Sequence, residues 1–215
     1  ECDFYSNPRL SPDGHHLAWL SWNHPNMPWD GCELWLAEIQ PDGLLSGQER
    51  VAGGPTESVF QPEWSRQGSL HFVSDRSGWW NLYRMRNGVE PLCPREAEFG
   101  RPQWAFDMRT YACLSEDEIL CTFTQNGMWR LARLDSRTKN LVELDLPYTD
   151  FGDLHLGPGF AVFEAGSATE PLSVIKLDLA SGRTEVLQRN FEPTIDPGYF
   201  SVPQAVEFPT EHGLT

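Results

Sequence analysis

Short runs of hydrophobic residues, separated by turn-forming residues, cover most of the chain. Residues 17–22, 70–74 and 118–124 are typical, because each is rich in aliphatic and aromatic side chains and is bounded by Gly, Asp, Asn or Ser. No segment has apolar residues at positions i, i+3, i+4 and i+7 over three turns, which is the pattern of an amphipathic helix. The 17 Pro and 18 Gly residues break the chain into short pieces. The pattern predicts an all-β protein.

A short strand-like phrase recurs at even spacing. Trp35, Tyr83, Trp129 and Ile175 take the same place in four successive units, 46 to 48 residues apart. Turn residues such as Asn-Gly or Ser-Gly follow each phrase, and a short run then closes the unit. This period is that of a four-stranded propeller blade. We therefore predict a β-propeller with four-stranded antiparallel blades, of which the chain holds about four to five.

A second phrase begins at Pro8, Pro62 and Pro102. We expect each copy to end one strand of a unit and a turn to lead from it into the next strand. Large rings dominate burial between stacked sheets, so the rings that recur in the units are predicted to pack between neighbouring blades: Trp64, Trp104, Trp35, Tyr83 and Trp129. In the third unit the segments 110–114, 118–124 and 127–135 all look extended, and the order of its strands stays open.

The charge of the chain narrows the classes of partner. There are 16 Lys and Arg residues against 31 Asp and Glu residues, and the formal net charge is −15. Phosphate backbones and anionic membranes attract clustered Lys and Arg, so we expect neither nucleic acid nor a membrane surface as a partner. The hydrophobic fraction of 40% is sufficient for a folded core.

Cysteine and histidine patterns predict no metal site and no cofactor. The five cysteines are Cys2, Cys32, Cys93, Cys113 and Cys121. Their odd number and the absence of C-x-x-C spacing argue against a disulfide framework and a zinc site, and favour reduced thiols in a cytoplasmic protein. His15 and His16 are adjacent, so in a strand they point to opposite faces. His71 lies in an apolar run and is expected to be a core or rim residue, and the acidic run 116–118 is expected to be a solvated turn.

Several stretches resemble known propellers. Residues 11–14 (Ser-Pro-Asp-Gly), 74–78 (Ser-Asp-Arg-Ser-Gly) and 177–182 (Leu-Asp-Leu-Ala-Ser-Gly) resemble the repeat of two groups, the Tol-system translocation propellers and the prolyl oligopeptidase family of serine peptidases. Residues 22–35 resemble a phrase of the acylaminoacyl-peptidase and dipeptidyl-aminopeptidase branch of that family. Residues 201–210 resemble that branch's crossing from propeller into hydrolase domain. The chain is thus identified as the propeller portion of such a peptidase.

This resemblance implies a propeller of about seven or eight blades that caps an α/β-hydrolase domain. Residues 1–198 would be blades, incomplete on the N-terminal side, and residues 199–215 would cross into the hydrolase. The chain starts without Met and is expected to be a piece of a longer protein. It contains no G-x-S-x-G sequence, so we expect no catalytic residue within it and no hydrolysis by this chain alone. The hydrolase domain and a short peptide are the expected partners, and open blade faces favour a homo-oligomer.

The loop at residues 24–30 differs from an ordinary strand connection. It carries two prolines, an imidazole, an indole and a carboxylate, and loops of this kind are often binding loops. The next unit has an equivalent loop at residues 75–80. We predict that both loops line the propeller face turned to the hydrolase, with Asp30 attracting the substrate's ammonium group and Trp29 stacking on a side chain. The substrate-facing candidates are His24, Trp29, Asp30, Asp75, Arg76 and Trp80. The alternatives are that Trp29 only closes the end of its blade and that Arg76 pairs with Asp75.

The function that these features favour is a non-catalytic propeller that gates the access of short peptides to a serine exopeptidase or oligopeptidase. Such a cover excludes water and positions the substrate. One alternative is a stand-alone binding or scaffolding propeller of the Tol-system type, which would be periplasmic. The other is a propeller enzyme in which acidic residues and histidines hold a metal in the central channel.

Overall fold

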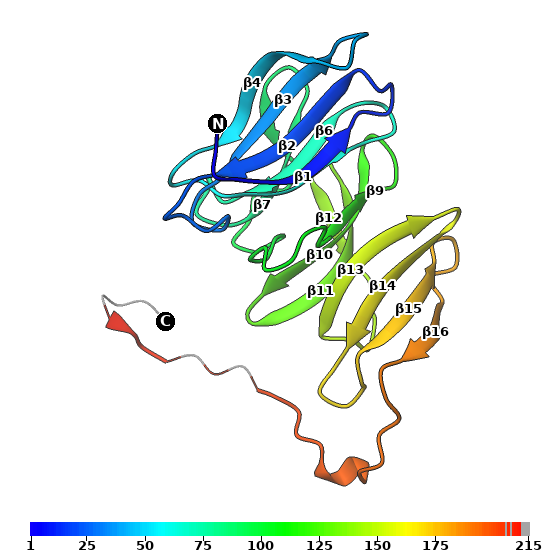
Figure 1. The fold of residues 1–215 in the computed structure, drawn as a ribbon. Coiled ribbons are helices and arrows are strands. Elements are labelled where there is room, and N and C mark those ends of the chain that lie inside the picture. Colours follow the sequence, from blue (N-terminus) through cyan, green and yellow to red (C-terminus); the bar gives the residue numbers. More distant parts are fainter. Residues whose placement is uncertain (205, 207, 212–215) are drawn as a thin grey trace.

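The computed structural model describes residues 1–204, 206 and 208–211. Its strands form four antiparallel sheets, and each sheet consists of four strands that follow one another in sequence (Figure 1). We call these sheets blades 1 to 4. The all-β prediction and the four-stranded blade are confirmed.

The strand bounds follow the predicted units closely. Blade 1 comprises β1 (Phe4–Leu10), β2 (His16–Trp22), β3 (Glu33–Ile39) and β4 (Leu45–Gly53). Blade 2 comprises β5 (Val59–Trp64), β6 (Leu70–Ser74), β7 (Asn81–Met85) and β8 (Val89–Pro91). Blade 3 comprises β9 (Tyr111–Cys113), β10 (Glu118–Gln125), β11 (Met128–Asp135) and β12 (Asn140–Glu143). Blade 4 comprises β13 (Asp150–Gly157), β14 (Phe160–Gly166), β15 (Ser173–Asp178) and β16 (Thr184–Arg189).

The blades form an open fan, with blade 1 and blade 4 at its two ends (Figure 1). The first strands of neighbouring blades lie close together: β1 contacts β5, and β9 contacts β13. These strands therefore form the inner edge of the fan. The fourth strands lie on the outside, and β16 is exposed along its whole length. A one-turn helix, η1 (Pro197–Tyr199), lies in the segment that follows β16.

The hydrophobic core lies between the blades. Leu20 and Leu34 of blade 1 pack with Phe72 of blade 2, and equivalent clusters join blade 2 to blade 3 and blade 3 to blade 4. Burying one such side chain contributes about 1.5–3 kcal/mol, so each interface holds the neighbouring blades firmly. Trp19 and Trp35 face each other across β2 and β3, and they alternate with the packed leucines. They therefore lie on the outer face of blade 1, which no blade covers in the described chain.

The first strand of blades 1, 2 and 4 carries a β-bulge. Each bulge has a non-glycine residue with positive φ: Asn7 at 49°, Gln61 at 47° and Asp153 at 44°. The bulge of blade 2 turns its side chain toward the next blade. There the Gln61 amide donates to the carbonyl oxygen of Tyr111 at 2.7 Å, and its Oε1 accepts from the backbone N–H of Thr110 at 2.7 Å. A buried glutamine thus joins blades 2 and 3.

Blade 3 departs from this repeat, and two predictions about it were wrong. The phrase at 102–105 does not end a strand, and the run at 110–114 corresponds to β9, the first strand of its blade. Trp104 is 77% exposed and does not pack between blades. The reason is an insertion at the position of the bulge. Glu98 pairs with Thr124 and the strand resumes with Tyr111 opposite Cys121, and the long stretch between them replaces the short bulge of the other blades.

Candidate functional site

One end of the blades collects the predicted loops. Because the strands of a blade alternate in direction, the connections between second and third strands and those between blades emerge at the same end. We call this end the loop face; the second-to-third-strand connections on it are residues 23–32, 75–80, 126–127 and 167–172. The segment after β16 runs past the same end (Figure 1). The loops at residues 24–30 and 75–80 both lie between second and third strands, so their predicted equivalence is confirmed.

The blade 1 loop places its three candidates differently. His24 is exposed, and the peptide bond that joins it to Pro25 is cis. Trp29 is half-buried and packs on the ring of Trp104, with ring centroids 4.3 Å apart. Asp30 is exposed, and its Oδ2 accepts from the backbone N–H of Met27 at 2.9 Å. That bond closes the turn and holds the carboxylate at the surface of the loop face.

The blade 2 loop is tied to the framework. Asp75 Oδ1 accepts from the backbone N–H of Ser58 at 2.8 Å, and burial raises the pKa of Asp75 above its ordinary value. Arg76 forms an ion pair with Glu57 at 2.8 Å, so the alternative pairing of Arg76 with Asp75 is not what the structure shows. Trp80 stacks on Phe60 at 5.9 Å within the core between blades 2 and 3. These three side chains hold the loop in place.

Ser58 joins the two loops. It is 1% exposed and lies in the connection between blades 1 and 2. Its hydroxyl donates to the carbonyl oxygen of Pro28 at 2.8 Å, while its backbone N–H donates to Asp75. The hydrogen bonds of buried Ser58 therefore tie the loops at residues 24–30 and 75–80 to each other.

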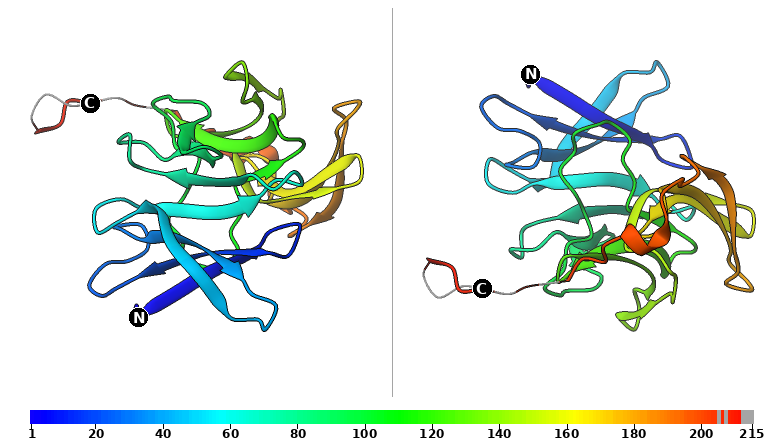
Figure 2. Two further views of the ribbon diagram at one scale, coloured as in Figure 1. Left: turned by 90° about the horizontal axis from the view of Figure 1, so that it is seen from above. Right: turned by 90° about the horizontal axis from the view of Figure 1, so that it is seen from below.

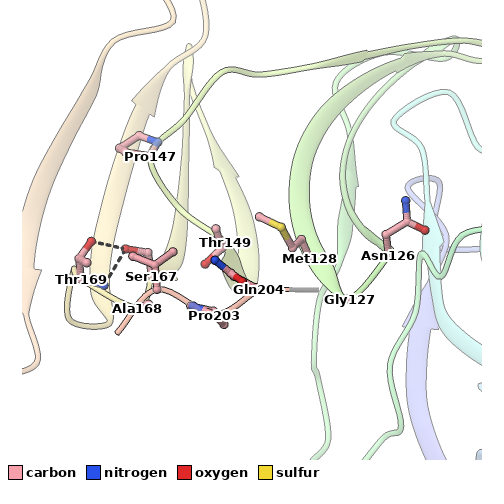
Figure 3. A pocket seen from close by; sticks show the side chains of 11 residues that line it. Asn126, Gly127, Met128, Pro147, Thr149, Ser167, Ala168, Thr169, Pro203 and Gln204 are labelled. Atoms are coloured by element: carbon pink, nitrogen blue, oxygen red, sulfur yellow. Dashed lines mark hydrogen bonds between the residues drawn. The ribbon is translucent and has the colours of Figure 1, made fainter. Parts of the chain in front are cut away.

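A cavity of about 380 Å³ lies between the loops of blades 3 and 4 and the segment after β16 (Figure 3). Its lining residues are Asn126, Gly127, Met128, Pro147, Thr149, Ser167, Ala168, Thr169, Val202, Pro203 and Gln204. None of them titrates near neutral pH, and the Ser167 hydroxyl accepts from the backbone N–H of Glu170 at 3.1 Å. A serine nucleophile needs an adjacent base. The cavity therefore offers hydrogen bonds and apolar contact, and no acid–base pair.

The described part of the chain shows neither a metal-binding cluster nor a membrane-spanning helix. Within residues 1–204, 206 and 208–211, no group of three or more His, Cys, Asp or Glu side chains is placed to hold a metal ion. Over the same residues, no helix has the length and apolar character needed to cross a membrane.

Similarity to solved structures decides the family. The chain matches puromycin hydrolase with 37% identity and a TM-score of 0.89, over 98% of this chain and 32% of that protein. A puromycin-hydrolyzing peptidase from Mycobacterium tuberculosis matches with 36% identity and a TM-score of 0.88, over 95% of this chain and 31% of that protein. The chain belongs to the prolyl oligopeptidase family and is the propeller portion of such a peptidase.

A more distant member of the prolyl oligopeptidase family shows the likeness of fold alone. Prolyl oligopeptidase B from Galerina marginata matches 98% of this chain and 30% of that protein, with 14% identity and a TM-score of 0.72. The chain thus spans about a third of the length of these family members. No protein-family model matches the chain, and no curated protein does.

The insertion of blade 3 supplies contacts between blades that the sequence did not reveal. We call residues 100–109 the arm. Arg101, Gln103, Trp104, Asp107 and Arg109 of the arm all contact other blades. The length of the connection could have indicated the arm in the sequence, because the segment 92–110 is far longer than other connections between blades, such as 54–58.

Proposed function

We propose that the chain is the non-catalytic, substrate-gating propeller of a serine exopeptidase that acts on short peptides. Residues 1–198 supply the blades, and residues 199–215 begin the crossing into an α/β-hydrolase domain that carries the catalytic serine. That domain and the peptide are the partners that we propose. The cytoplasm is the proposed compartment, because all five cysteines are free thiols.

The observation that carries the proposal is the match to puromycin hydrolase, which extends over almost the whole chain and leaves most of that enzyme outside it. Puromycin has an amide bond and a free α-amino group. We therefore propose a substrate with a free amino terminus, and favour aminopeptidase over acylaminoacyl-peptidase specificity. The net charge of −15 supports this choice, because an anionic propeller raises the local concentration of cationic substrates.

The contacts divide the six candidates into two groups. Asp75, Arg76 and Trp80 are engaged by the framework and support the loop face. His24 and Asp30 are exposed there. We propose that Asp30 attracts the substrate's ammonium group and that His24, together with Trp29, lines the same path.

Kinetics of an Asp30→Asn variant test this proposal in the full-length protein. The substrates are an aminoacyl anilide with a free amino group and its N-acetylated counterpart. Loss of one solvated charge contact is worth about 1 kcal/mol, so KM for the free amine should rise about five-fold. KM for the blocked substrate should stay within about two-fold, because that substrate has no ammonium group.

Asp42→Asn is the matched control. Asp42 is an exposed carboxylate at the opposite end of blade 1, and its Oδ1 accepts from the backbone N–H of Leu44 at 3.0 Å, as Asp30 accepts from Met27. The control removes the same charge and the same kind of turn bond. Equal effects of Asp30→Asn on both substrates would refute the role of Asp30. If the full-length protein neither hydrolyses these substrates nor reacts with a fluorophosphonate, the peptidase proposal fails and a binding or scaffolding propeller replaces it.

A further inference from the structure

The arm leaves its own blade and crosses the inner edge of the fan. Seen from below, the segment between β8 and β9 extends away from blade 3 and reaches the strands of blade 1 (Figure 2). The two ends of the arm stay together, because the Thr110 hydroxyl donates to the carbonyl oxygen of Phe99 at 2.6 Å. The arm is thus a projection from an otherwise continuous inner strand.

Blade 1 holds the tip of the arm. The Gln103 amide donates to the hydroxyl of Ser6 at 3.0 Å, and both side chains are buried. Asp107 forms an ion pair with Arg9, which lies farther along the same inner strand, β1. Two polar contacts with one strand fix both the position and the direction of the arm.

Blades 2 and 4 hold the base of the arm. The Arg109 guanidinium lies 3.4 Å from the carboxylate of Glu63 on β5. The backbone carbonyl oxygen of Arg109 accepts from the backbone N–H of Leu154 on β13 at 3.1 Å. Arg101 donates to the carbonyl oxygen of Phe151 on β13 at 2.6 Å. The arm thus contacts the first strand of every other blade in the structure.

The charges of these contacts balance locally. Arg9 and Arg109 each approach both Glu63 and Asp107, so two guanidinium groups face two carboxylates. Burial acts against the ionised form of Asp107, yet the hydrogen bond from Arg9 and the nearby positive charges lower the pKa of this carboxyl below its ordinary value. The network keeps the arm across the inner strands at neutral pH.

The inner strands of a propeller surround its axial channel. We propose that the arm closes this channel and that this closure, within the gating function proposed above, restricts the enzyme to short peptides. Under this proposal the rings of Trp104 and Phe106, which are 77% and 72% exposed on the arm, fill the space that a peptide would need. Substrate then has to enter beside the loop face, between the propeller and the hydrolase domain.

Shortening the arm in the full-length protein tests the proposal. An Asn-Gly link replaces residues 101–108, so that Gly100-Asn-Gly-Arg109 joins Phe99 to Thr110, which a hydrogen bond already holds close together. The measurement is kcat/KM for an aminoacyl anilide and for peptides of about 10 and about 20 residues. We expect the anilide value to stay within about two-fold and the value for the longest peptide to rise about ten-fold.

A second variant tests whether the arm closes the channel if the shortened protein does not fold. Trp104→Ala with Phe106→Ala removes two exposed rings and keeps every polar contact of the arm. Trp79→Ala, which removes a 40% exposed ring from the blade 2 loop, is its control. The double variant should raise kcat/KM for the long peptides and the control should not. Unchanged length selectivity in folded variants would overturn the proposal, whereas absence of hydrolysis by the wild-type protein would overturn the proposed function itself.

Discussion

His71 provides a direct test of how burial controls stability in this propeller. The residue is 0% exposed on β6 and lies between Glu63 of β5 and Arg84 of β7. Its Nδ1–H donates to the carbonyl oxygen of Ser69 at 3.1 Å, and its Nε2 has no hydrogen-bond partner among the described residues. Burial lowers the pKa of His71 to about 4. The hydrogen bond to Ser69 opposes this shift and the charge of Arg84 adds to it, while the carboxylates of Glu116 and Glu90 also oppose it.

The sign and size of the effect follow from proton linkage. An unfolded histidine has a pKa of about 6.5, so between pH 6.5 and pH 4 the unfolded chain binds a proton that the folded chain does not. The free energy of unfolding therefore falls as the pH drops through this window. The difference between a pKa of about 6.5 in the unfolded chain and about 4 in the folded chain corresponds to about 3 kcal/mol, of which about 2 kcal/mol is lost between pH 7 and pH 4.5.

A His71→Asn variant removes the titrating group and keeps an N–H donor near the position of Nδ1. Urea unfolding at pH 7 and pH 4.5 measures the stability of both proteins. The wild-type chain should lose about 2 kcal/mol more than the variant. His15→Asn, which removes an exposed imidazole, controls for the loss of one histidine. If His71→Asn and the wild type lose the same stability within about 0.5 kcal/mol, buried neutral His71 is not a source of acid sensitivity.

Two further predictions concern the contacts between blades and the thiols. Gln61→Ala should lower the free energy of unfolding by about 2 kcal/mol, because it leaves the buried carbonyl of Tyr111 unpaired. Gln67→Ala in an exposed turn is the matched control, and equal urea midpoints for the two variants would contradict this prediction. Iodoacetamide at neutral pH should modify Cys2 in the folded chain and spare the other four cysteines, because burial raises the pKa of both Cys32 and Cys113 to about 12. Rapid labelling of Cys32, measured by mass spectrometry, would contradict this prediction.

The blades could be predicted because their pattern is local. Trp35 and Tyr83 lie in third strands whose neighbours are a few residues away, so alternation and turn residues define each sheet without long-range information. The arm could not be found in this way. Residues 102–105 repeat the sequence pattern of an inner strand, but Gln103 and Trp104 make their contacts with blade 1, far away in the sequence.

Polar contacts between blades were equally hidden from the sequence. Glu116 belongs to an acidic run that we expected to be solvated, yet it accepts hydrogen bonds from the hydroxyls of Ser65 at 2.9 Å and Ser69 at 2.6 Å. Its neighbour Asp117 lies 3.3 Å from the guanidinium of Arg84, whose side chain is 7% exposed. A buried guanidinium requires carboxylates nearby; Glu90 of blade 2 supplies one at 2.9 Å, and blade 3 adds Glu116 and Asp117. The expectation of a solvated turn was wrong for Glu116 because its partners come from another blade.

The bulge of the inner strand explains why an arm can occur where it does. At Asn7, Gln61 and Asp153 the inner strand already loses register with the second strand and resumes its pairing one step later. An insertion at that position interrupts no further ladder bonds, and the strand can resume as it does at Tyr111. The inner strand also borders the axis, so an insertion there can extend across the inner edge of the fan, as the arm does (Figure 2). The same irregularity that joins blade 2 to blade 3 through Gln61 thus gives blade 3 a place for the arm without disturbing its sheet.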